Sequence, residues 1–229
     1  MKTLLLFLSL AIIIFLPLST SKNQAWIAVR DTNGNPLNKM NRYWITPANH
    51  TENGGGVRAV VYLGSSTDLQ QQKTTICPTS VVLSHSPTDD GFAVYFTPEN
   101  PRYEKIAEFT PLNIHFAPVY PLCRDLTVWK VDNLLPDLPP AYRHTISTGA
   151  KLGNHNDVSS WFQIRRMALA DSRKYSYKLV FCLQGITTYC QNIGIVPQNG
   201  YLRLVLSQHP MPFQFKLDNV IKIGMAAEA

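Results

Sequence analysis

The sequence predicts an all-β fold, and three observations support this prediction. Short runs of strand-forming residues follow one another along the chain, and several of them alternate apolar with polar side chains. Beyond the first 21 residues, no stretch keeps the spacing of an amphipathic helix without an interrupting proline. The 16 prolines and 12 glycines fall mostly between the strand-like runs, where turns are expected. Such a pattern indicates a sandwich or a barrel, and alternation alone does not choose between them.

Ten strands are expected, in chain order. The clearest alternation lies near the end of the chain, where three leucines in 201–207 alternate with Arg203, Val205 and Ser207. The ten runs are Tyr43–Thr46, Val57–Leu63, Ser80–Ser84, Phe92–Phe96, Leu112–Phe116, Thr127–Asp132, Trp161–Arg165, Tyr177–Cys182, Tyr201–Ser207 and Phe213–Leu217.

The first 21 residues have the layout of a secretory signal peptide. Lys2 supplies one positive charge, an apolar run follows from Thr3 to Leu18, and small residues end at Ser21. The run is shorter than the ~20 residues that a membrane-spanning helix needs, and no basic cluster follows it. We therefore expect a signal peptide over residues 1–21, a single domain over 22–229, and no membrane association once the signal is removed.

Charge and motif content exclude several functional classes. The chain has 21 Lys and Arg against 15 Asp and Glu, and the longest basic pieces are the pairs 165–166 and 173–174. A nucleic-acid partner is not expected, because such proteins concentrate charge in a stripe or run. The six histidines are scattered, and no G-x-S-x-G, H-E-x-x-H or phosphate-binding glycine motif is present. The sequence therefore predicts neither an enzyme nor a bound cofactor.

The four cysteines predict disulfides. They are Cys77, Cys123, Cys182 and Cys190, an even number in a chain expected to be exported. A metal site would need a close pair such as C-x-x-C, and none is present. Four cysteines allow three connectivities, and spacing alone does not choose among them.

A turn followed by a strand carries the most specific pattern in the chain. It reads Val29-x-Asp31-x-x-Gly34-x-x-Leu37, then five residues, then Tyr43-x-Ile45. Asn33-Gly34 suits the left-handed backbone of a tight turn, and Pro36 fixes its own φ and favours an extended backbone at Asn35. At all six fixed positions the pattern resembles the opening signature of the plant Kunitz trypsin inhibitors of the soybean type. Further similar segments are Gly54–Gly56, Cys77-Pro78, Thr110–Phe116, Val128–Val131, Trp161-Phe162, Tyr177–Cys182 and Cys190 followed by Ile193–Ile195.

The resemblance implies a β-trefoil, which is a six-stranded barrel capped by three hairpins with pseudo-threefold repetition. It also implies the disulfides Cys77–Cys123 and Cys182–Cys190. The implied function is a secreted serine endopeptidase inhibitor without a cofactor, expected to act as a monomer on a trypsin-like protease. The expected location is the extracellular space (the apoplast), with the vacuole as the alternative.

The resemblance further places an inhibitory loop between the first two cysteines. Counting back from the segment that begins at Pro111 puts the reactive bond at Arg102–Tyr103, with Asn100 and Pro101 shaping the loop. The proline favours an extended backbone, and an arginine suits the carboxylate of a trypsin-like specificity pocket. Arg102 is thus the predicted P1 residue, the one that enters the pocket of the protease. Lys105 is the second candidate for P1, and the Cys77–Cys123 disulfide is expected to tie together the region that displays the loop.

Two departures from the family pattern keep another function open. Lys39 stands where the family commonly has an asparagine that braces the loop, although Asn38 and Asn41 are close by. Tyr103 replaces the small or aliphatic residue that usually follows P1. The alternative is a re-targeted or non-inhibitory trefoil: an inhibitor of cysteine or aspartic proteases or of amylase, a storage protein, or a taste-active protein like miraculin. Separately, Asn49-His50-Thr51 is a sequon that predicts surface glycosylation at Asn49.

Overall fold

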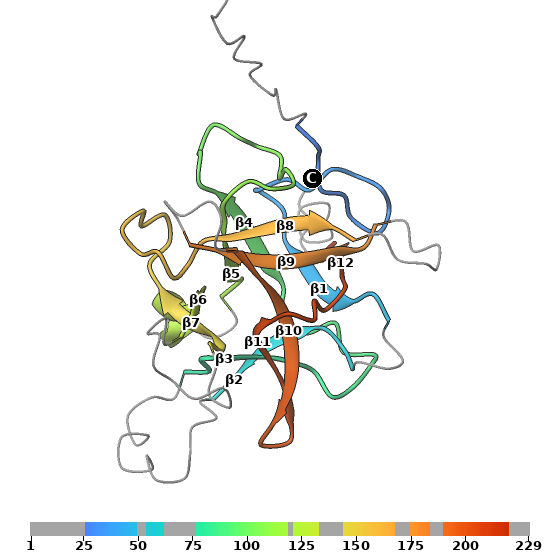
Figure 1. Ribbon diagram of the computed structural model, residues 1–229, viewed down its shortest axis with the longest axis vertical. Helices are drawn as coiled ribbons and strands as arrows, with labels where there is room; N and C mark the ends of the chain where they lie inside the picture. Colours follow the sequence, from blue (N-terminus) through green and yellow to red (C-terminus); the bar gives the residue numbers. More distant parts are fainter. Residues whose placement is uncertain are drawn as a thin grey trace, which may run out of the picture.

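The computed structural model describes residues 26–49, 54–61, 77–118, 121–132, 144–167, 175–183 and 190–219. The expected signal peptide, residues 1–21, lies outside these ranges. The described residues form a short 3₁₀ helix, η4 (Pro121–Leu126), and twelve strands, shown in Figure 1. The strands are β1 (Tyr43–Pro47), β2 (Val57–Val60), β3 (Ser80–Leu83), β4 (Val94–Pro98), β5 (Leu112–Phe116), β6 (Val128–Val131), β7 (Ile146–Ala150), β8 (Phe162–Arg166), β9 (Tyr177–Cys182), β10 (Cys190–Gln198), β11 (Tyr201–Ser207) and β12 (Phe213–Leu217).

Six of the strands close into a barrel. Strand β1 pairs with β4 and β12, β5 pairs with β4 and β8, and β9 pairs with β8 and β12, all antiparallel. The other six strands form the hairpins β2–β3, β6–β7 and β10–β11. Every four successive strands thus contribute two barrel strands and one hairpin, which gives three repeats. This arrangement confirms the predicted β-trefoil.

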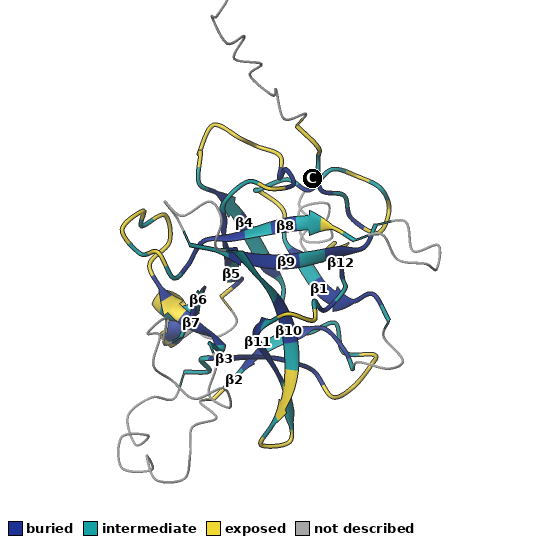
Figure 2. Ribbon diagram, in the orientation of Figure 1, coloured by how far each residue is buried: buried dark blue, intermediate teal, exposed yellow. Residues whose placement is uncertain are grey.

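The barrel is filled by alternate side chains of its six strands. Tyr43, Phe96, Phe162, Tyr177 and Phe215 are almost completely buried. The rings of Phe96 and Phe215 meet edge to face with their centroids 5.2 Å apart, a preferred geometry for aromatic pairs. Figure 2 shows the same division, with buried and intermediate residues along the barrel strands and exposed residues mainly in the connecting loops. The period-two alternation in the sequence therefore reports which side chains enter the core.

Two strands, β7 and β10, were not predicted from the sequence. Strand β7 contains Gly149 with a φ of 111°, and β10 contains Gly194 and Pro197. Glycine and proline usually mark turns or weak strands. In β10, however, a Cβ atom at Gly194 would lie 2.5 Å from the carbonyl oxygen of His209, so glycine permits a close approach of two backbones. The predicted end of the second strand at Leu63 lies outside the described residues.

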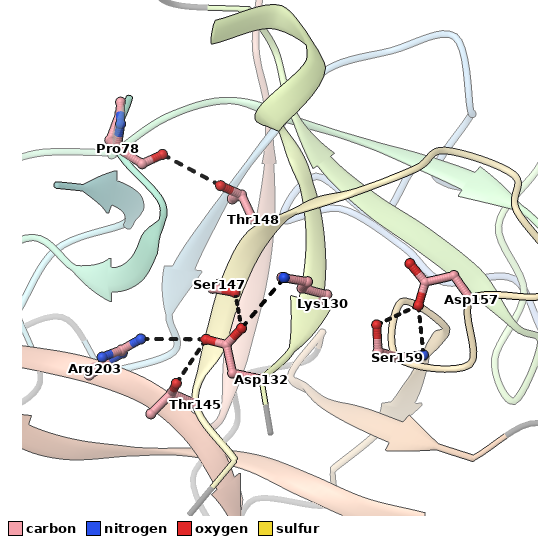
Figure 3. Close-up of polar contacts among 9 residues, drawn as sticks. All are labelled: Pro78, Lys130, Asp132, Thr145, Ser147, Thr148, Asp157, Ser159 and Arg203. Atoms are coloured by element: carbon pink, nitrogen blue, oxygen red, sulfur yellow. Dashed lines mark hydrogen bonds and ion pairs between the residues drawn. The ribbon is translucent and has the colours of Figure 1, made fainter. Parts of the chain in front are cut away.

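A carboxylate at the end of β6 links two of the hairpins. Figure 3 shows Asp132 accepting hydrogen bonds from the hydroxyls of Ser147 (2.6 Å) and Thr145 (3.1 Å). The guanidinium of Arg203, on β11, lies 3.7 Å from the same carboxylate and is almost completely buried. Buried charges are tolerated when they are paired and hydrogen-bonded in this way. The cluster therefore joins the β6–β7 hairpin to β11.

Both predicted disulfides are present, Cys77–Cys123 and Cys182–Cys190. Within the described part of the chain no cysteine is free, and no group of three or more His, Cys, Asp and Glu side chains could hold a metal ion. A helix long and apolar enough to cross a membrane is not found in the same residues.

Candidate functional site

The signature turn of residues 29–37 has a local structural cause. The buried carboxylate of Asp31 accepts hydrogen bonds from the backbone N–H groups of Asn33 (2.9 Å) and Asn35 (2.8 Å). Between them, Gly34 has a φ of 85°, a conformation that costs glycine nothing. The predicted left-handed turn is thereby confirmed, and Asp31 explains why an acidic residue is needed three positions before the glycine.

This turn supports the chain that leaves the candidate loop, residues 99–105 between β4 and β5. The backbone N–H of Val29 donates to the carbonyl oxygen of Ile106 (2.9 Å), and the N–H of Ile106 donates to the carbonyl of Leu37 (3.0 Å). All three side chains are fully buried. The N–H of Lys39 then donates to the carbonyl of Glu104 at 2.9 Å. The most specific motif of the sequence therefore anchors one end of the loop.

The other end of the loop is anchored by the β4–β5 ladder. Pro98 closes the ladder opposite Leu112, and the N–H of Glu99 donates to the carbonyl of Pro111 at 3.0 Å. The carboxylate of Glu99 lies 3.5 Å from Nδ1 of His155, which belongs to the neighbouring loop of residues 151–160. Both loops are largely exposed, as Figure 2 shows.

Residues Asn100 to Tyr103 form a tight turn. The N–H of Tyr103 donates to the carbonyl of Asn100 (3.1 Å), and the N–H of Arg102 donates to the side-chain oxygen of Asn100 (3.1 Å). Pro101 occupies the second turn position, for which its restricted φ is suited. The extended backbone expected around Pro101 is therefore wrong for these residues and holds only up to Pro98, where β4 ends.

The predicted P1 residue is displayed at this turn. Arg102 and Tyr103 are exposed, and Tyr103 exposes 43% of its surface. Lys105, the second candidate for P1, is also exposed, but its backbone already forms a bridge with Asn38. The loop of residues 99–105, drawn in green above β4 in Figure 1, therefore exposes Arg102 within its turn, whereas the backbone of Lys105 is joined to the 29–39 segment.

Lys39 braces the loop from the side. Its Nζ donates a hydrogen bond to the carbonyl oxygen of Pro101 at 2.6 Å. The side chains of Asn38 and Asn41 act within their own turn: Asn38 accepts from the N–H of Met40 (2.9 Å), and the Asn41 amide lies 3.5 Å from the hydroxyl of Tyr43. Sequence reasoning treated the lysine as a departure and missed this role. The length of the lysine side chain was the feature of the sequence that could have predicted this contact.

The neighbouring loop is held in place by a buried asparagine on β5. Asn113 is fully buried, and its amide group donates to the carbonyl of Ser160 (2.8 Å) and accepts from the N–H of Gly153 (2.8 Å). Within the loop, the carboxylate of Asp157 accepts from the N–H and hydroxyl of Ser159, as Figure 3 shows. The loop beside the candidate site is thus fixed at both ends.

The Cys77–Cys123 disulfide does not lie at the candidate loop. Cys123 lines a small apolar cavity together with Phe116. Phe116 is the last residue of β5, whereas the loop joins the barrel where Pro98 pairs with Leu112, the first residue of that strand. The expectation that this disulfide ties together the region displaying the loop is therefore wrong. Backbone hydrogen bonds to the 29–39 segment hold the loop instead.

A buried carboxylate follows the loop directly. Glu108 is largely buried and accepts hydrogen bonds from the backbone N–H (3.1 Å) and Nε (3.3 Å) of Arg166. Arg166 also donates to the hydroxyl of Tyr177 (3.3 Å), and burial raises the pKa of that tyrosine. The pairing with Arg166, whose side chain is 43% exposed, satisfies the buried carboxylate of Glu108 and joins the chain after the loop to β8.

His115, on β5, gives the fold a pH dependence. Burial lowers the pKa of His115 to about 4, below the 6.5 of an exposed histidine, and its ring stacks on Tyr95 at 5.2 Å. The unfolded chain therefore binds a proton more readily than the native chain does. The resulting stability is full above about pH 6.5 and is lost as the pH falls toward 4.

We expect the free energy of unfolding to fall by about 2.5 kcal/mol between pH 7.5 and pH 4.5 through His115 alone. In the His115→Gln variant this part of the loss should disappear, since glutamine does not titrate. Urea unfolding at the two pH values measures it, with His209→Gln, an exposed histidine, as the matched control. An acid loss in His115→Gln equal to that of the wild type would contradict the assignment.

Asn49, the predicted glycosylation site, is partly exposed two residues after β1 ends. His50 and Thr51, which complete the sequon, lie outside the described residues.

Comparison with known proteins identifies the family. The family model described as trypsin and protease inhibitor, Kunitz legume type, matches residues 29–217. Miraculin of Synsepalum dulcificum is 31% identical, with 87% of each chain covered. A Kunitz-type trypsin inhibitor of Glycine max is 33% identical over 82% of this chain and 83% of its own.

Solved structures agree with the family match. Soybean trypsin inhibitor superposes with a TM-score of 0.63 at 29% identity, covering 84% of this chain and 99% of its own. A Kunitz-type cysteine protease inhibitor from potato superposes with a TM-score of 0.67 at 26% identity, covering 85% of this chain and 98% of its own. Protease inhibitors are not enzymes, and the prediction of a non-enzyme is confirmed on that ground. The chain belongs to the Kunitz family of trypsin and protease inhibitors.

Proposed function

We propose that this protein is a secreted inhibitor of a trypsin-like serine endopeptidase, with Arg102 as its P1 residue. The observation that carries the proposal is an exposed arginine on a turn whose two ends are both fixed to the barrel. A guanidinium matches the carboxylate of a trypsin-like pocket in charge and hydrogen bonding. Because the loop is already ordered, little conformational entropy is lost when it docks. Soybean trypsin inhibitor, which shares the fold, is known in complex with porcine trypsin.

A second candidate function is supported by the turn itself. A serine protease binds its substrate in an extended form, and the hydrogen bond between Tyr103 N–H and Asn100 carbonyl opposes that form. The exposed Tyr103 also differs from the small residue usual after P1. These features favour a re-targeted trefoil, acting on another protease class. Relatives of this chain include an aspartic protease inhibitor of Solanum tuberosum, a potato cysteine protease inhibitor and miraculin.

Titration of trypsin with the purified protein tests the proposal. We expect one molecule of inhibitor to block one molecule of trypsin, with mass spectrometry finding a slow cut between Arg102 and Tyr103. A cut after Lys105 would move the P1 residue to the second candidate. A folded protein with both disulfides that leaves trypsin fully active would reject the serine protease target, and titration of cysteine and aspartic proteases would then follow.

Secretion and glycosylation belong to the same proposal. The apolar residues 3–18 and the small residues that follow support cleavage after Ser21, and the partly exposed Asn49 supports an attached glycan. Mass spectrometry of the protein secreted by a eukaryotic host tests both expectations. The mature chain should begin at Lys22 and should carry an oligosaccharide on Asn49.

A further inference from the structure

The outer face of the β8–β9 ladder, drawn in orange in Figure 1, carries two positive charges opposite each other. Arg165 and Lys178 are direct partners in the register of these strands, and they alternate with the fully buried Ile164 and Leu179. Like charges at opposed positions of an antiparallel pair destabilise a sheet. Among the residues that the structure describes, no carboxylate forms an ion pair with Arg165 or Lys178. The repulsion is therefore not relieved within this part of the protein.

Arg165 is held in one position by uncharged neighbours. Its Nε and Nη2 donate to Oε1 of Gln163 at 3.1 and 2.8 Å. Its Nη2 also contacts the sulfurs of Cys182 (3.3 Å) and Cys190 (3.2 Å). Burial lowers the pKa of Arg165, because the guanidinium has lost part of its hydration without gaining a negative partner. A bound anion would supply that partner.

Phe109 adds a strained aromatic side chain to the same surface. Cζ of Arg165 lies 5.2 Å from the centroid of its ring, and Phe109 exposes 44% of its surface. The backbone of Phe109 has a φ of 63°, a conformation that is rare for a bulky residue and strains it. The N–H of Phe109 donates to the carbonyl of Ile164 at 3.1 Å, which fixes the residue against β8. The ring is thus presented beside the guanidinium at a cost in backbone energy.

Three features that each cost stability meet at one surface, which is typical of a site kept for binding. We propose that Phe109, Arg165 and Lys178 form a binding site for an acidic polysaccharide, a chain of sugars that carry carboxylates. Arg165 pairs with one carboxylate in the plane of its guanidinium, and Lys178 pairs with the carboxylate of a neighbouring sugar. The ring of Phe109 packs against the apolar C–H face of a sugar ring. This activity is separate from inhibition and uses no residue of the 99–105 loop.

Positive charge continues past this site, which favours a polymer over a single anion. Nη2 of Arg166, whose side chain is 43% exposed, donates to the hydroxyl of Tyr177 at 3.3 Å. The backbone N–H of Arg30 donates to the same hydroxyl at 2.9 Å, so the two arginines lie near each other. A row of cations suits a ligand with repeated negative charges. The exposed aromatic ring favours a sugar, because an acidic peptide or a simple anion needs charge alone.

Calorimetric titration of the purified protein with a galacturonate oligomer at low salt tests the inference. Lys178→Glu places a carboxylate opposite Arg165, so the affinity should fall at least about tenfold. The same change turns a repulsive pair into an attractive one, so the thermal unfolding midpoint should rise by about 2 °C. Lys151→Glu is the matched control, since Lys151 is exposed in the loop that precedes β8 and the change of net charge is the same. The control should bind like the wild type.

A second variant tests the sugar contact. Phe109→Gly removes the ring, and glycine adopts the positive φ without strain. We expect the affinity for the galacturonate oligomer to fall about fivefold. Dextran sulfate and polyglutamate are the comparison ligands, because both carry repeated negative charge without a carboxylated sugar.

Failure of the wild type to bind the oligomer, or an unchanged affinity in Lys178→Glu, would overturn the inference. An equal loss in Lys151→Glu would also overturn it, since net charge would then explain the binding. Comparison ligands that bind as tightly as the oligomer, with no effect of Phe109→Gly, would reject the sugar as the ligand. Lys178→Glu should inhibit trypsin like the wild type. A wild-type protein that binds the oligomer and leaves trypsin active would reject the proposed function alone.

Discussion

Replacing Arg102 with glutamate should abolish trypsin inhibition. The substitution removes the guanidinium that would pair with the carboxylate of the specificity pocket and places a second negative charge against it. Loss of one partner of a buried charge pair costs about 2–5 kcal/mol, and reversal of the charge costs more. We therefore expect the inhibition constant to rise by about 10³-fold or more, measured by titration of trypsin at constant salt.

The fold should be unaffected by this change. The loop contact made by Arg102 is through its backbone N–H, which donates to Asn100, and its side chain is exposed. Lys105→Glu is the matched control, since it reverses a charge three residues away in the same loop. Strong inhibition by Arg102→Glu, with its unfolding midpoint unchanged, would show that Arg102 is not P1. Loss of inhibition in Lys105→Glu alone would transfer that role to Lys105.

Removal of the Cys77–Cys123 disulfide should give the largest loss of stability among the changes considered. The loop that it closes spans 46 residues, against 8 for Cys182–Cys190. Loop-closure entropy then predicts a loss of about 4 kcal/mol for Cys77→Ser/Cys123→Ser and about 2.5 kcal/mol for Cys182→Ser/Cys190→Ser. Urea unfolding of the two double variants measures these values.

Removal of the two disulfides should also differ in its effect on trypsin inhibition and on other contacts. Since Cys123 lies at the end of β5 away from the candidate loop, its variant should keep full trypsin inhibition at temperatures where it remains folded. The Cys182→Ser/Cys190→Ser variant also removes the two sulfurs that Arg165 contacts at 3.3 and 3.2 Å. For this variant we therefore expect a loss of unfolding free energy above the entropic value. A larger loss from the short loop than from the long one would contradict the entropic account. Loss of inhibition in the folded Cys77→Ser/Cys123→Ser protein would contradict the remote placement.

Much of the fold was open to prediction because alternation and turn residues are local properties. The strand at Phe213–Leu217 follows directly from its period of two, and the turn at Gly34 follows from the need for a positive φ. Strand β10 did not follow, because Gly194 and Pro197 have the composition of a turn. These two residues lie in a strand because β10 pairs with β11 from Asn192 to Gln198.

The candidate site was predicted only in outline. Counting along the chain placed Arg102 in an exposed loop between β4 and β5, as the structure has it, and its role as P1 stays a prediction. The hydrogen bond from Lys39 to Pro101 could not be predicted by counting along the chain, because the two residues are 62 positions apart. The position of the Cys77–Cys123 disulfide was mistaken for a similar reason: two cysteines on either side of a loop in sequence need not lie beside it in space.

The sequence by itself determined the all-β class and the family, because both depend on local patterns of side chains. Tertiary structure alone decided the closure of the barrel and the contacts from Lys39 to Pro101 and Glu104, on the two sides of the proposed reactive bond. These features arise from hydrogen bonds between segments far apart in the chain, whose formation depends on the whole barrel being packed.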